Sequence, residues 1–246
     1  MSKLIAVWGC PGSGKTTVSV KLAEALYARN KSGAAIVVVF ADHVTPVIPT
    51  VFPNYRSEEV YSIGTVLSKP DLFPDDVVSN LVTVKGRMNM GYIGFKDGEN
   101  RFTYPEYTKE KVESFYRALR AVADYIIVDC MTMPEQSLLT EVALENAEQM
   151  IRLSVPDLKC LSFNISQTPI FMANGYLPEN HIQVMNVTNQ EFAMPVSDTR
   201  AHLGKIRYTV PFSSFIREQY MEGCLYEPTK DRKFAGVMKD LAEKVV

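Results

Sequence analysis

The chain has 246 residues, of which 46% are hydrophobic and 22% charged, and its formal net charge is −2. This length suffices for one large α/β domain or two small ones, and the composition is ordinary for a globular protein with a sizeable core. The near-zero charge gives no whole-protein basic field for nucleic acid or an anionic membrane, and no segment approaches the ~20 apolar residues of a membrane span.

The segment after the first apolar run carries the strongest functional signal. Leu4–Trp8 is predicted to form a buried strand and Thr17–Arg29 an amphipathic helix. Between them, Gly9–Thr16 matches the phosphate-loop pattern G-x-x-x-x-G-K-[ST] at every fixed position. The N–H groups of such a loop and the helix dipole attract phosphate. Lys15 would reach the β- and γ-phosphates, and the Thr16 hydroxyl would bind Mg²⁺. The alternative is a glycine-rich turn that only joins a strand to a helix. The residues predicted to bind nucleotide here are Gly9, Cys10, Pro11, Gly12, Ser13, Gly14, Lys15, Thr16 and Thr17.

The cysteines and histidines are scattered along the chain. Because no two cysteines form a C-x-x-C pair, their spacing argues against a zinc site and against a disulfide framework. A reducing cytoplasm is therefore the expected setting, and the phosphate loop begins too early to leave room for a secretory signal. Each histidine is interpreted as a surface or packed side chain rather than a metal ligand. The residues concerned are Cys10, Cys130, Cys160, Cys224, His43, His181 and His202.

The part of the chain after the first helix begins clearly and then becomes hard to interpret. Ala35–Phe40 is a β-branched run that predicts a central strand. Prolines interrupt Val44–Tyr107 repeatedly, so this segment is interpreted either as an irregular surface insert or as a functional loop that serves as a lid or partner contact. The elements expected within it are a short helix in Ser57–Leu67 and strands at Leu81–Val84 and Met90–Phe95.

From Lys109 onward, helix-like and strand-like segments alternate. Lys109–Ala123 carries an apolar stripe at three- and four-residue steps, and Pro156 opens a later helix that Pro169 should end or kink. The final helix, Asp231–Val245, mixes acids and lysines on its polar face, which favours packing on the sheet over lying on a membrane. The remaining expected elements are strands at Tyr125–Asp129, Met150–Val155, His181–Asn186 and Lys205–Val210, and helices at Glu135–Ala147, Ser197–Leu203 (stopped by Gly204) and Ser213–Met221.

This alternation predicts an α/β fold with one doubly wound, mostly parallel sheet and helices on both faces. The sequence contains no internal repeat, low-complexity tract or linker. Residues 1–246 are therefore expected to form a single P-loop nucleotide-binding domain with an insert-like region at about 44–107.

Two aspartates follow predicted strands, where parallel α/β sheets bind ligands. Asp129 ends a run of four apolar residues, which is the pattern of a Walker B acid that binds Mg²⁺ directly or through water. A helix N-cap is the alternative role for it. Asp42 could orient an attacking water or bind the water shell of Mg²⁺, or it could only form a turn. Lys15 and Asp42 are the predicted catalytic residues, and Thr16 and Asp129 the predicted metal ligands.

The order of these motifs resembles the MinD/ParA group of P-loop ATPases, which includes the pilus-associated CpaE/TadZ branch. The matching motifs are Gly9–Thr16, Val37–Asp42, Tyr125–Asp129, Ser154–Asp157, the strand ending at Asn186, and Val210-Pro211 before a helix. The resemblance implies an ATP- and Mg²⁺-binding ATPase. In this family the Asn at that strand end contacts adenine, which implies that Asn186 and the Pro211-Phe212 segment hold the base. An amide both donates and accepts hydrogen bonds, as adenine recognition needs; a turn-capping role is the alternative for Asn186.

Two departures from the family pattern bear on activity. Members commonly carry a lysine that reaches across a dimer to the partner's nucleotide, and here that position is Cys10, followed by Pro11. The second strand usually ends in D-x-D, and here only Asp42 remains. We therefore expect slow hydrolysis and a weakened homodimer, while the loop amides, Lys15 and Thr16 still support nucleotide binding.

Three functions fit these features. The first is a nucleotide-dependent switch with a protein partner in partition, division-site placement or positioning of a pilus or secretion machine. The second is a small-molecule kinase, whose loop can have the same sequence but which usually carries an arginine-rich lid that is not obvious here. The third is a degenerate nucleotide-binding scaffold, which the missing lysine and the missing first acid favour.

Overall fold

The computed structural model of the protein describes residues 2–30, 33–54, 62–189, 194, 195, 197, 199, 203 and 205–246. The strands are β1 (Lys3–Gly9), β2 (Ile36–Phe40), β3 (Val82–Val84), β4 (Arg87–Ile93), β5 (Tyr125–Asp129), β6 (Gln149–Ser154), β7 (Ile182–Asn186) and β8 (Tyr208–Val210). The helices are α1 (Lys15–Arg29), α2 (Ile48–Val51), α3 (Ile63–Leu67), α4 (Pro74–Val78), α5 (Lys109–Val122), α6 (Leu138–Asn146), α7 (Leu158–Ala173), α9 (Ser214–Met221) and α10 (Arg232–Val245). Short 3₁₀ helices span Pro134–Gln136 and Pro178–Asn180.

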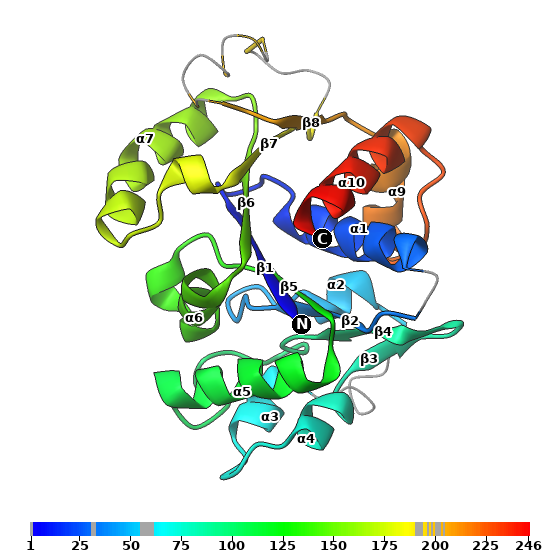
Figure 1. The fold of residues 1–246 in the computed structure, drawn as a ribbon, viewed down its shortest axis with the longest axis vertical. Helices are drawn as coiled ribbons and strands as arrows, with labels where there is room; N and C mark the ends of the chain where they lie inside the picture. Colours follow the sequence, from blue (N-terminus) through cyan, green and yellow to red (C-terminus); the bar gives the residue numbers. More distant parts are fainter. Residues whose placement is uncertain are drawn as a thin grey trace.

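The strands form one eight-stranded sheet in the order β3-β4-β2-β5-β1-β6-β7-β8 (Figure 1). Among the described strands, only β3 runs antiparallel to its neighbour, and every other pair is parallel. Parallel strands need crossover connections, which the intervening helices supply. The predicted α/β doubly wound fold is therefore confirmed.

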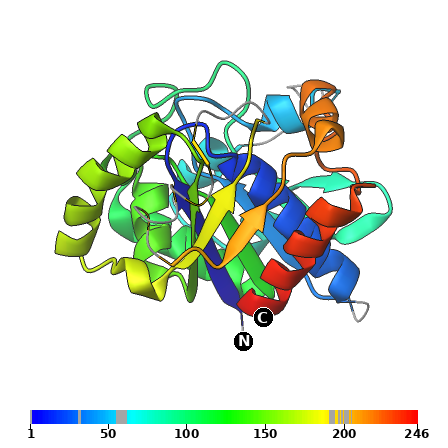
Figure 2. The same ribbon diagram turned by 90° about the horizontal axis from the view of Figure 1, so that it is seen from above.

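Helices cover both faces of the sheet, and the alternation of side chains along β1 shows how. Ile5 and Val7 point into the core beneath α1 and α10, whereas Leu4, Ala6 and Trp8 point into the core beneath α5 and α6. All five side chains are fully buried. A strand buried on both faces has no polar face, which is why the first apolar run is continuous. Figure 2 shows the sheet between the two helical layers.

The segment between residues 44 and 107 contributes to the sheet and to both cores, and the strands expected there at Leu81–Val84 and Met90–Phe95 are confirmed as β3 and β4. β4 pairs with β2, and β3 pairs with β4 at the edge of the sheet. Ile48 and Val51 of α2 pack into one core, and Ile63 and Val66 of α3 into the other. The described part of this segment is thus an ordered extension of the sheet rather than an irregular insert. Residues 55–61, and with them most of the first half of the helix expected in Ser57–Leu67, lie outside the described residues.

Two predictions about late helices have different outcomes. Of the two outcomes expected at Pro169, an end or a kink of the helix, the end is wrong, because α7 continues to Ala173. The physical reason is tertiary packing: Phe171, two residues after the proline, is buried and stacks on Trp8 with ring centroids 3.8 Å apart. The packing of the final helix is confirmed, since Phe234, Met238 and Leu241 of α10 are buried in the core that α10 shares with α1. The helix expected at Ser197–Leu203 and its stop at Gly204 lie mostly outside the described residues.

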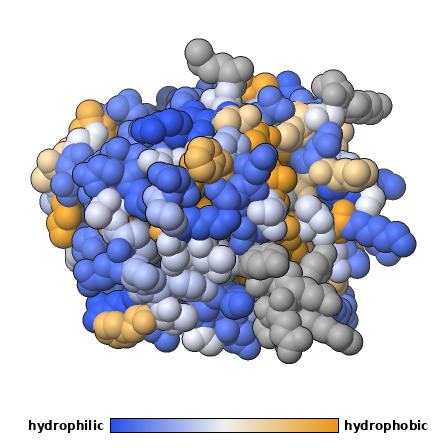
Figure 3. Space-filling view, turned by 90° about the horizontal axis from the view of Figure 1, so that it is seen from below, coloured by the Kyte–Doolittle hydropathy of each residue, from blue (hydrophilic) through white to orange (hydrophobic). Residues whose placement is uncertain are grey.

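The surface of the described residues carries some apolar side chains, among them Met88 and Phe102. Seen from below, it is mostly hydrophilic, and hydrophobic residues form small separate groups (Figure 3). Single exposed apolar side chains are normal on protein surfaces. None of the described helices is long and apolar enough to cross a membrane.

Candidate functional site

The loop Gly9–Thr16 lies at the carboxyl end of β1, in the middle of the sheet. β1 pairs with β5 on one side and β6 on the other. The crossover through α1 leads to β2 beyond β5, while the chain from β5 leads through α6 to β6 on the opposite side of β1. The direction of winding therefore reverses here, and the crevice at such a point is where open α/β sheets bind ligands.

The loop has the backbone geometry of an anion cradle. Gly12 and Gly14 have φ values of 70° and 78°, which are left-handed conformations that glycine adopts without strain. A Cβ on Gly14 would also lie only 2.5 Å from Asn186 Nδ2. Side chains cap the first turns of α5, α6, α7, α9 and α10, whereas α1, whose N-cap residue is Gly14, has no side-chain cap among the described residues. The first-turn N–H groups of α1 are thus free of capping side chains and can receive an anion.

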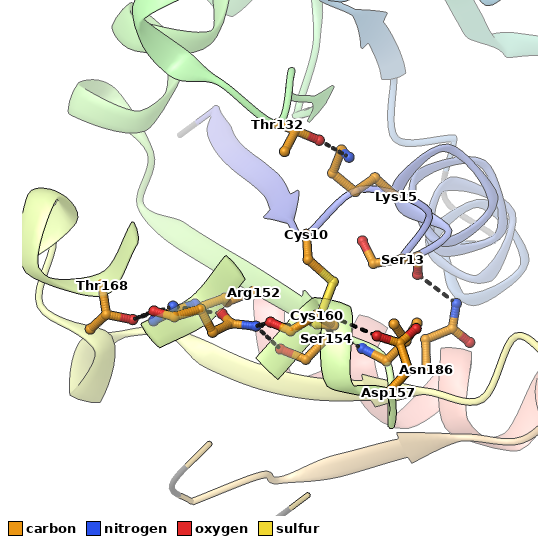
Figure 4. The surroundings of a disulfide bond; sticks show 12 residues. Cys10, Ser13, Lys15, Thr132, Arg152, Ser154, Asp157, Cys160, Thr168 and Asn186 are labelled. Carbon is orange, nitrogen blue, oxygen red and sulfur yellow. Dashed lines mark hydrogen bonds between the residues drawn. A yellow bond between two sulfur atoms is a disulfide. The ribbon is translucent and has the colours of Figure 1, made fainter. Parts of the chain in front are cut away.

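Lys15 extends from the start of α1 toward the end of the neighbouring strand β5. Its Nζ donates a hydrogen bond to Thr132 Oγ1 at 2.8 Å (Figure 4). Burial lowers the pKa of Lys15, and the negative charge of Asp129 opposes this shift. Lys15 therefore has a neutral hydroxyl partner rather than a direct ion pair among the described residues, which leaves its charge available for a phosphate.

Thr16 and Asp129 contact each other directly. The Thr16 hydroxyl donates to Asp129 Oδ2 at 2.6 Å, and the Asp129 side chain is buried. Burial raises the pKa of Asp129 to about 6, although the charge of Lys15 and the bond from Thr16 favour the carboxylate. The predicted pair of metal ligands is thus assembled, with a hydroxyl and a carboxylate oxygen at one point of the cradle. Hard oxygen ligands of this kind suit Mg²⁺.

Asp42 lies just beyond β2, the other neighbour of β5. Its Oδ1 accepts hydrogen bonds from the backbone N–H groups of Val44 and Thr45 at 2.8 and 2.9 Å, so it forms the turn that was the alternative to a catalytic role. Burial, the largest cause, lowers the pKa of Lys15 and raises the pKa of Asp129. The negative charge of Asp42 raises both pKa values by a smaller amount. Asp42 is therefore near the cradle while one of its oxygens is occupied.

A cavity of about 370 Å³ opens beside the loop. Residues Gly12 to Thr17 line one side, and Asn186, Pro211 and Phe212 line another. The sheet explains this meeting of distant segments: Asn186 at the end of β7 pairs with Val210 of β8, so Pro211 follows directly beside it. Asn186 Nδ2 donates to the Ser13 carbonyl at 2.8 Å, which joins the two sides (Figure 4).

The sequence did not point to several residues of this site. Arg217 and Tyr220 of α9 and Phe234 of α10 line the cavity, and Thr132 holds Lys15. The α9 residues follow the predicted base segment by only a few positions, so a helix starting after Pro211 was a usable signal. No motif in the sequence marks Thr132, because its role depends on where the chain turns after β5.

The expectation that the cysteines form no disulfide is wrong for one pair. Cys10 of the loop and Cys160 of α7 are joined by a disulfide, with their Cα atoms 5.6 Å apart (Figure 4). A separation of 150 residues carries no pairing signal in the sequence. The adjacent strands β1 and β6 bring the two cysteines together, because each lies shortly after one of these strands. Cys130 and Cys224 are free.

The residues present fit a nucleotide phosphate and its metal ion. The Ser13 hydroxyl is buried at the loop and has no hydrogen-bond partner among the described residues. A buried polar group without a partner is costly, and a phosphate oxygen would satisfy this one. The uncapped start of α1, the Lys15 ammonium and the Thr16–Asp129 oxygen pair supply the complementary donors and ligands.

Comparisons with solved structures give the same fold. The chain is similar to the septum site-determining protein MinD of Pyrococcus horikoshii OT3 complexed with Mg-ADP, with 21% identity, a TM-score of 0.74, and coverage of 100% of this chain and 96% of that chain. It is similar to a ParA family ATPase from Chlorobium tepidum TLS, with 14% identity, a TM-score of 0.80 and 98% coverage of both chains. For apo McdA from Cyanothece the values are 13% identity, a TM-score of 0.71, and 100% and 99% coverage. No family model and no curated protein matches the chain. The chain thus has the fold of the MinD and ParA ATPases.

Proposed function

We propose that this chain is a MinD/ParA-like ATPase that binds Mg-ATP and acts as a nucleotide-dependent switch. The observation that carries the proposal is the single crevice where the uncapped phosphate loop, the Thr16–Asp129 pair and the Asn186–Pro211 wall meet. The fold shared with MinD, whose solved structure contains Mg-ADP, supports it. A glycine-rich turn that only joins a strand to a helix does not explain why these three features occur together.

Each part of the crevice has a proposed role. The amides of Gly12 to Thr16 and the Lys15 ammonium hold the phosphates, and Asn186 with Pro211 and Phe212 holds the base. Thr16 and Asp129 hold Mg²⁺, which neutralises charge on the phosphates when bound. Asp42 orients the attacking water with the carboxylate oxygen that does not close the turn.

We propose the cellular role as a class of process rather than as a named pathway. Its partner is a protein that distinguishes the ATP and ADP states, in partition, division-site placement or the positioning of a pilus or secretion machine, as in the CpaE/TadZ branch. We place this work in the cytoplasm. Neither nucleic acid nor membrane is a proposed direct partner, because the net charge is close to zero.

A nucleotide-binding scaffold without useful turnover is a second candidate, and the structure gives a specific reason for it. Cys10 occupies the place of the family's cross-dimer lysine, and its side chain is buried in a disulfide. No group at this position reaches a partner's nucleotide. Slow, intrinsic hydrolysis is the behaviour that separates the proposed ATPase from a scaffold.

Single-turnover hydrolysis with protein in excess over γ-labelled ATP distinguishes these functions. We expect labelled phosphate to be released to water faster than in Lys15→Ala, because that variant lacks the loop cation. A rate equal to that of Lys15→Ala would support the scaffold and reject the ATPase. If a mixture of small-molecule metabolites is added to the reaction and one of them receives the labelled phosphate, the protein is instead a kinase.

A further inference from the structure

The disulfide between Cys10 and Cys160 lies within the phosphate loop itself, and the proposed ATPase reaction does not use it. It is buried: Cys10 is 0% and Cys160 2% exposed, and Val155 and Phe163 cover it. It ties the second residue of the loop to the first turn of α7. On the other side, Asn186 holds the Ser13 carbonyl. The short loop is thus fixed at two points.

The surroundings of Cys160 are built to stabilise a thiolate. Its Sγ accepts hydrogen bonds from the Val155 N–H at 3.3 Å and from Asn164 Nδ2 at 3.2 Å. It is the third residue of a 16-residue helix, so the positive end of the helix dipole also favours negative charge there.

A buried cation strengthens this arrangement. Arg152 is 4% exposed, lacks an acidic partner among the described residues, and donates to Asn164 Oδ1 and Thr168 Oγ1, each at 2.7 Å (Figure 4). Its Nε is buried and has no hydrogen-bond partner among the described residues, and its guanidinium carbon lies 5.4 Å from the centroid of the Trp8 ring. Burial lowers the pKa of Arg152 to about 10, so it remains charged at neutral pH. Asn164 therefore links the sulfur of Cys160 to a positive charge that has no acidic partner among the described residues.

We propose that Cys10 and Cys160 are a redox-active pair that regulates nucleotide affinity at the phosphate loop, with a dithiol reductant as the co-reactant. The inference rests on the proposed nucleotide site. The disulfide form holds the loop in the conformation that receives phosphate, and the dithiol form releases Cys10 from α7 and loosens the loop. Fixing a binding loop before the ligand arrives raises affinity, because less conformational entropy is lost on binding.

In the thiol–disulfide exchange, Cys10 is the sulfur that the reductant attacks and Cys160 is the leaving group. Pro11 and Gly12, next to Cys10, are exposed, so opening of the loop gives a reductant access to the sulfur of Cys10. The reductant thiolate attacks Cys10 Sγ, the S–S bond breaks, and Cys160 leaves as the stabilised thiolate. The second thiol of the reductant then attacks the mixed disulfide at the reductant's own sulfur and releases Cys10. The reductant loses two electrons and becomes a disulfide, and Cys10 and Cys160 become thiols after taking up protons.

Binding and redox state are then coupled in both directions. If reduction weakens nucleotide binding by a given factor, saturating nucleotide must make the disulfide harder to reduce by the same factor. Nucleotide also closes the loop, which slows attack on Cys10. A disulfide that does not influence the conformation of the loop predicts neither effect.

The test compares the oxidised protein with the same protein after dithiothreitol treatment. Alkylation under denaturing conditions followed by mass spectrometry should find Cys130 and Cys224 modified in the oxidised form and all four cysteines modified in the reduced form. Calorimetry with Mg-ADP should then show binding about five-fold weaker after reduction, at the low end of the coupling that is typical between two sites. Reoxidation should restore the affinity, and saturating Mg-ADP should slow reduction of the pair.

Two variants sharpen the result. Cys160→Ser should bind Mg-ADP as the reduced protein does and should not respond to dithiothreitol, whereas Cys224→Ser, the matched control, should respond as the unmodified protein does. If Cys160→Ser fails to fold by circular dichroism, the oxidised and reduced natural chains still give the comparison.

The outcomes separate this inference from the proposed function. Equal Mg-ADP affinity in both redox states would overturn the redox coupling and leave the nucleotide site intact. Absence of binding in both states would reject the proposed function and the coupling with it. Four free thiols in protein purified without reductant and treated with a disulfide oxidant would also overturn the proposal.

Discussion

Two polar pairs at the phosphate loop show how single residues prepare the site. The Lys15 ammonium donates a hydrogen bond to the Thr132 hydroxyl, and the Thr16 hydroxyl donates one to the Asp129 carboxylate. Both side chains are thereby oriented before a ligand arrives, and the partner of Lys15 is a neutral group that a phosphate can replace. Of these four side chains, the Asp129 carboxylate costs the folded protein the most stability. Its burial disfavours the negative charge that binding a metal ion requires.

This cost predicts a pH dependence of stability. The pKa of Asp129 rises from 3.8 to about 6 in the folded protein, so the folded state holds a proton that the unfolded state has lost. Stability from this group is complete below the unfolded pKa and is lost as the pH rises to about 6. Urea unfolding between pH 4 and 7 should show a loss on the order of 2 kcal/mol that is absent in Asp129→Asn. Asp240→Asn, an exposed acid on α10, is the control. Parallel pH profiles for Asp129→Asn and the natural chain would contradict the assignment.

The sequence could predict residues that belong to a motif, but not residues that depend on chain geometry. Lys15 and Thr16 were identifiable from the loop pattern and Asp129 from its place after an apolar run. Thr132 was not, since a threonine three residues beyond a strand has no distinctive pattern. The pairing of Cys10 with Cys160 was missed because only the adjacency of β1 and β6 brings them together.

At the scale of elements, α7 shows where local rules fail. Pro169 removes a backbone donor from the helix, and local propensity predicts an end there. The next turn nevertheless stays helical, with Asn174 N–H bonded to the Ile170 carbonyl, because Phe171 packs on Trp8. Strongly periodic or fully apolar segments such as α5 and β5 were located within one or two residues. In residues 44–107 the strands β3 and β4 were also expected, whereas the short helices α2 and α4 were hidden by prolines and by their length.

The anchoring role of Phe171 can be measured directly. Phe171→Ala should lower the free energy of unfolding by about 3 kcal/mol, because it removes a buried ring and leaves a cavity against Trp8. Met172→Ala, the neighbouring residue, which is 48% exposed, is the matched control and should cost less than about 1 kcal/mol. Urea denaturation followed by circular dichroism gives both values. Equal losses in the two variants would show that Phe171 does not anchor the end of α7.

At the scale of the whole molecule, the sheet assembles a crevice from segments that are distant in the chain. Ser13 and Asn186, 173 positions apart, are hydrogen-bonded because β1, β6, β7 and β8 are consecutive in the sheet. Alternation of strands and helices was enough to predict the doubly wound class. The strands expected at Leu81–Val84 and Met90–Phe95 correspond to β3 and β4. Their places in the sheet, with β4 beside β2 and β3 at the edge, were not predictable, because the segment has no clear periodic pattern.

The resemblance to the MinD/ParA group leads us to expect weak self-association of the whole molecule. Position 10, where the resemblance implies a lysine that reaches a partner's nucleotide, holds Cys10, whose side chain is buried. We expect light scattering after gel filtration to show at most weak dimerisation with Mg-ATP. A tight dimer that forms only with Mg-ATP would contradict this expectation and place the cross-dimer contact elsewhere.

Calorimetric titration with Mg-ATP tests the central claim, nucleotide binding at Gly9–Thr16, most directly. The natural chain should bind, and Lys15→Ala should lose at least about a hundred-fold in affinity, because a charge-assisted bond to phosphate is lost from a desolvated site. Lys244→Ala, an exposed lysine of α10, is the matched control and should bind as the natural chain does. Unchanged affinity in Lys15→Ala, or no binding by the natural chain, would contradict the account.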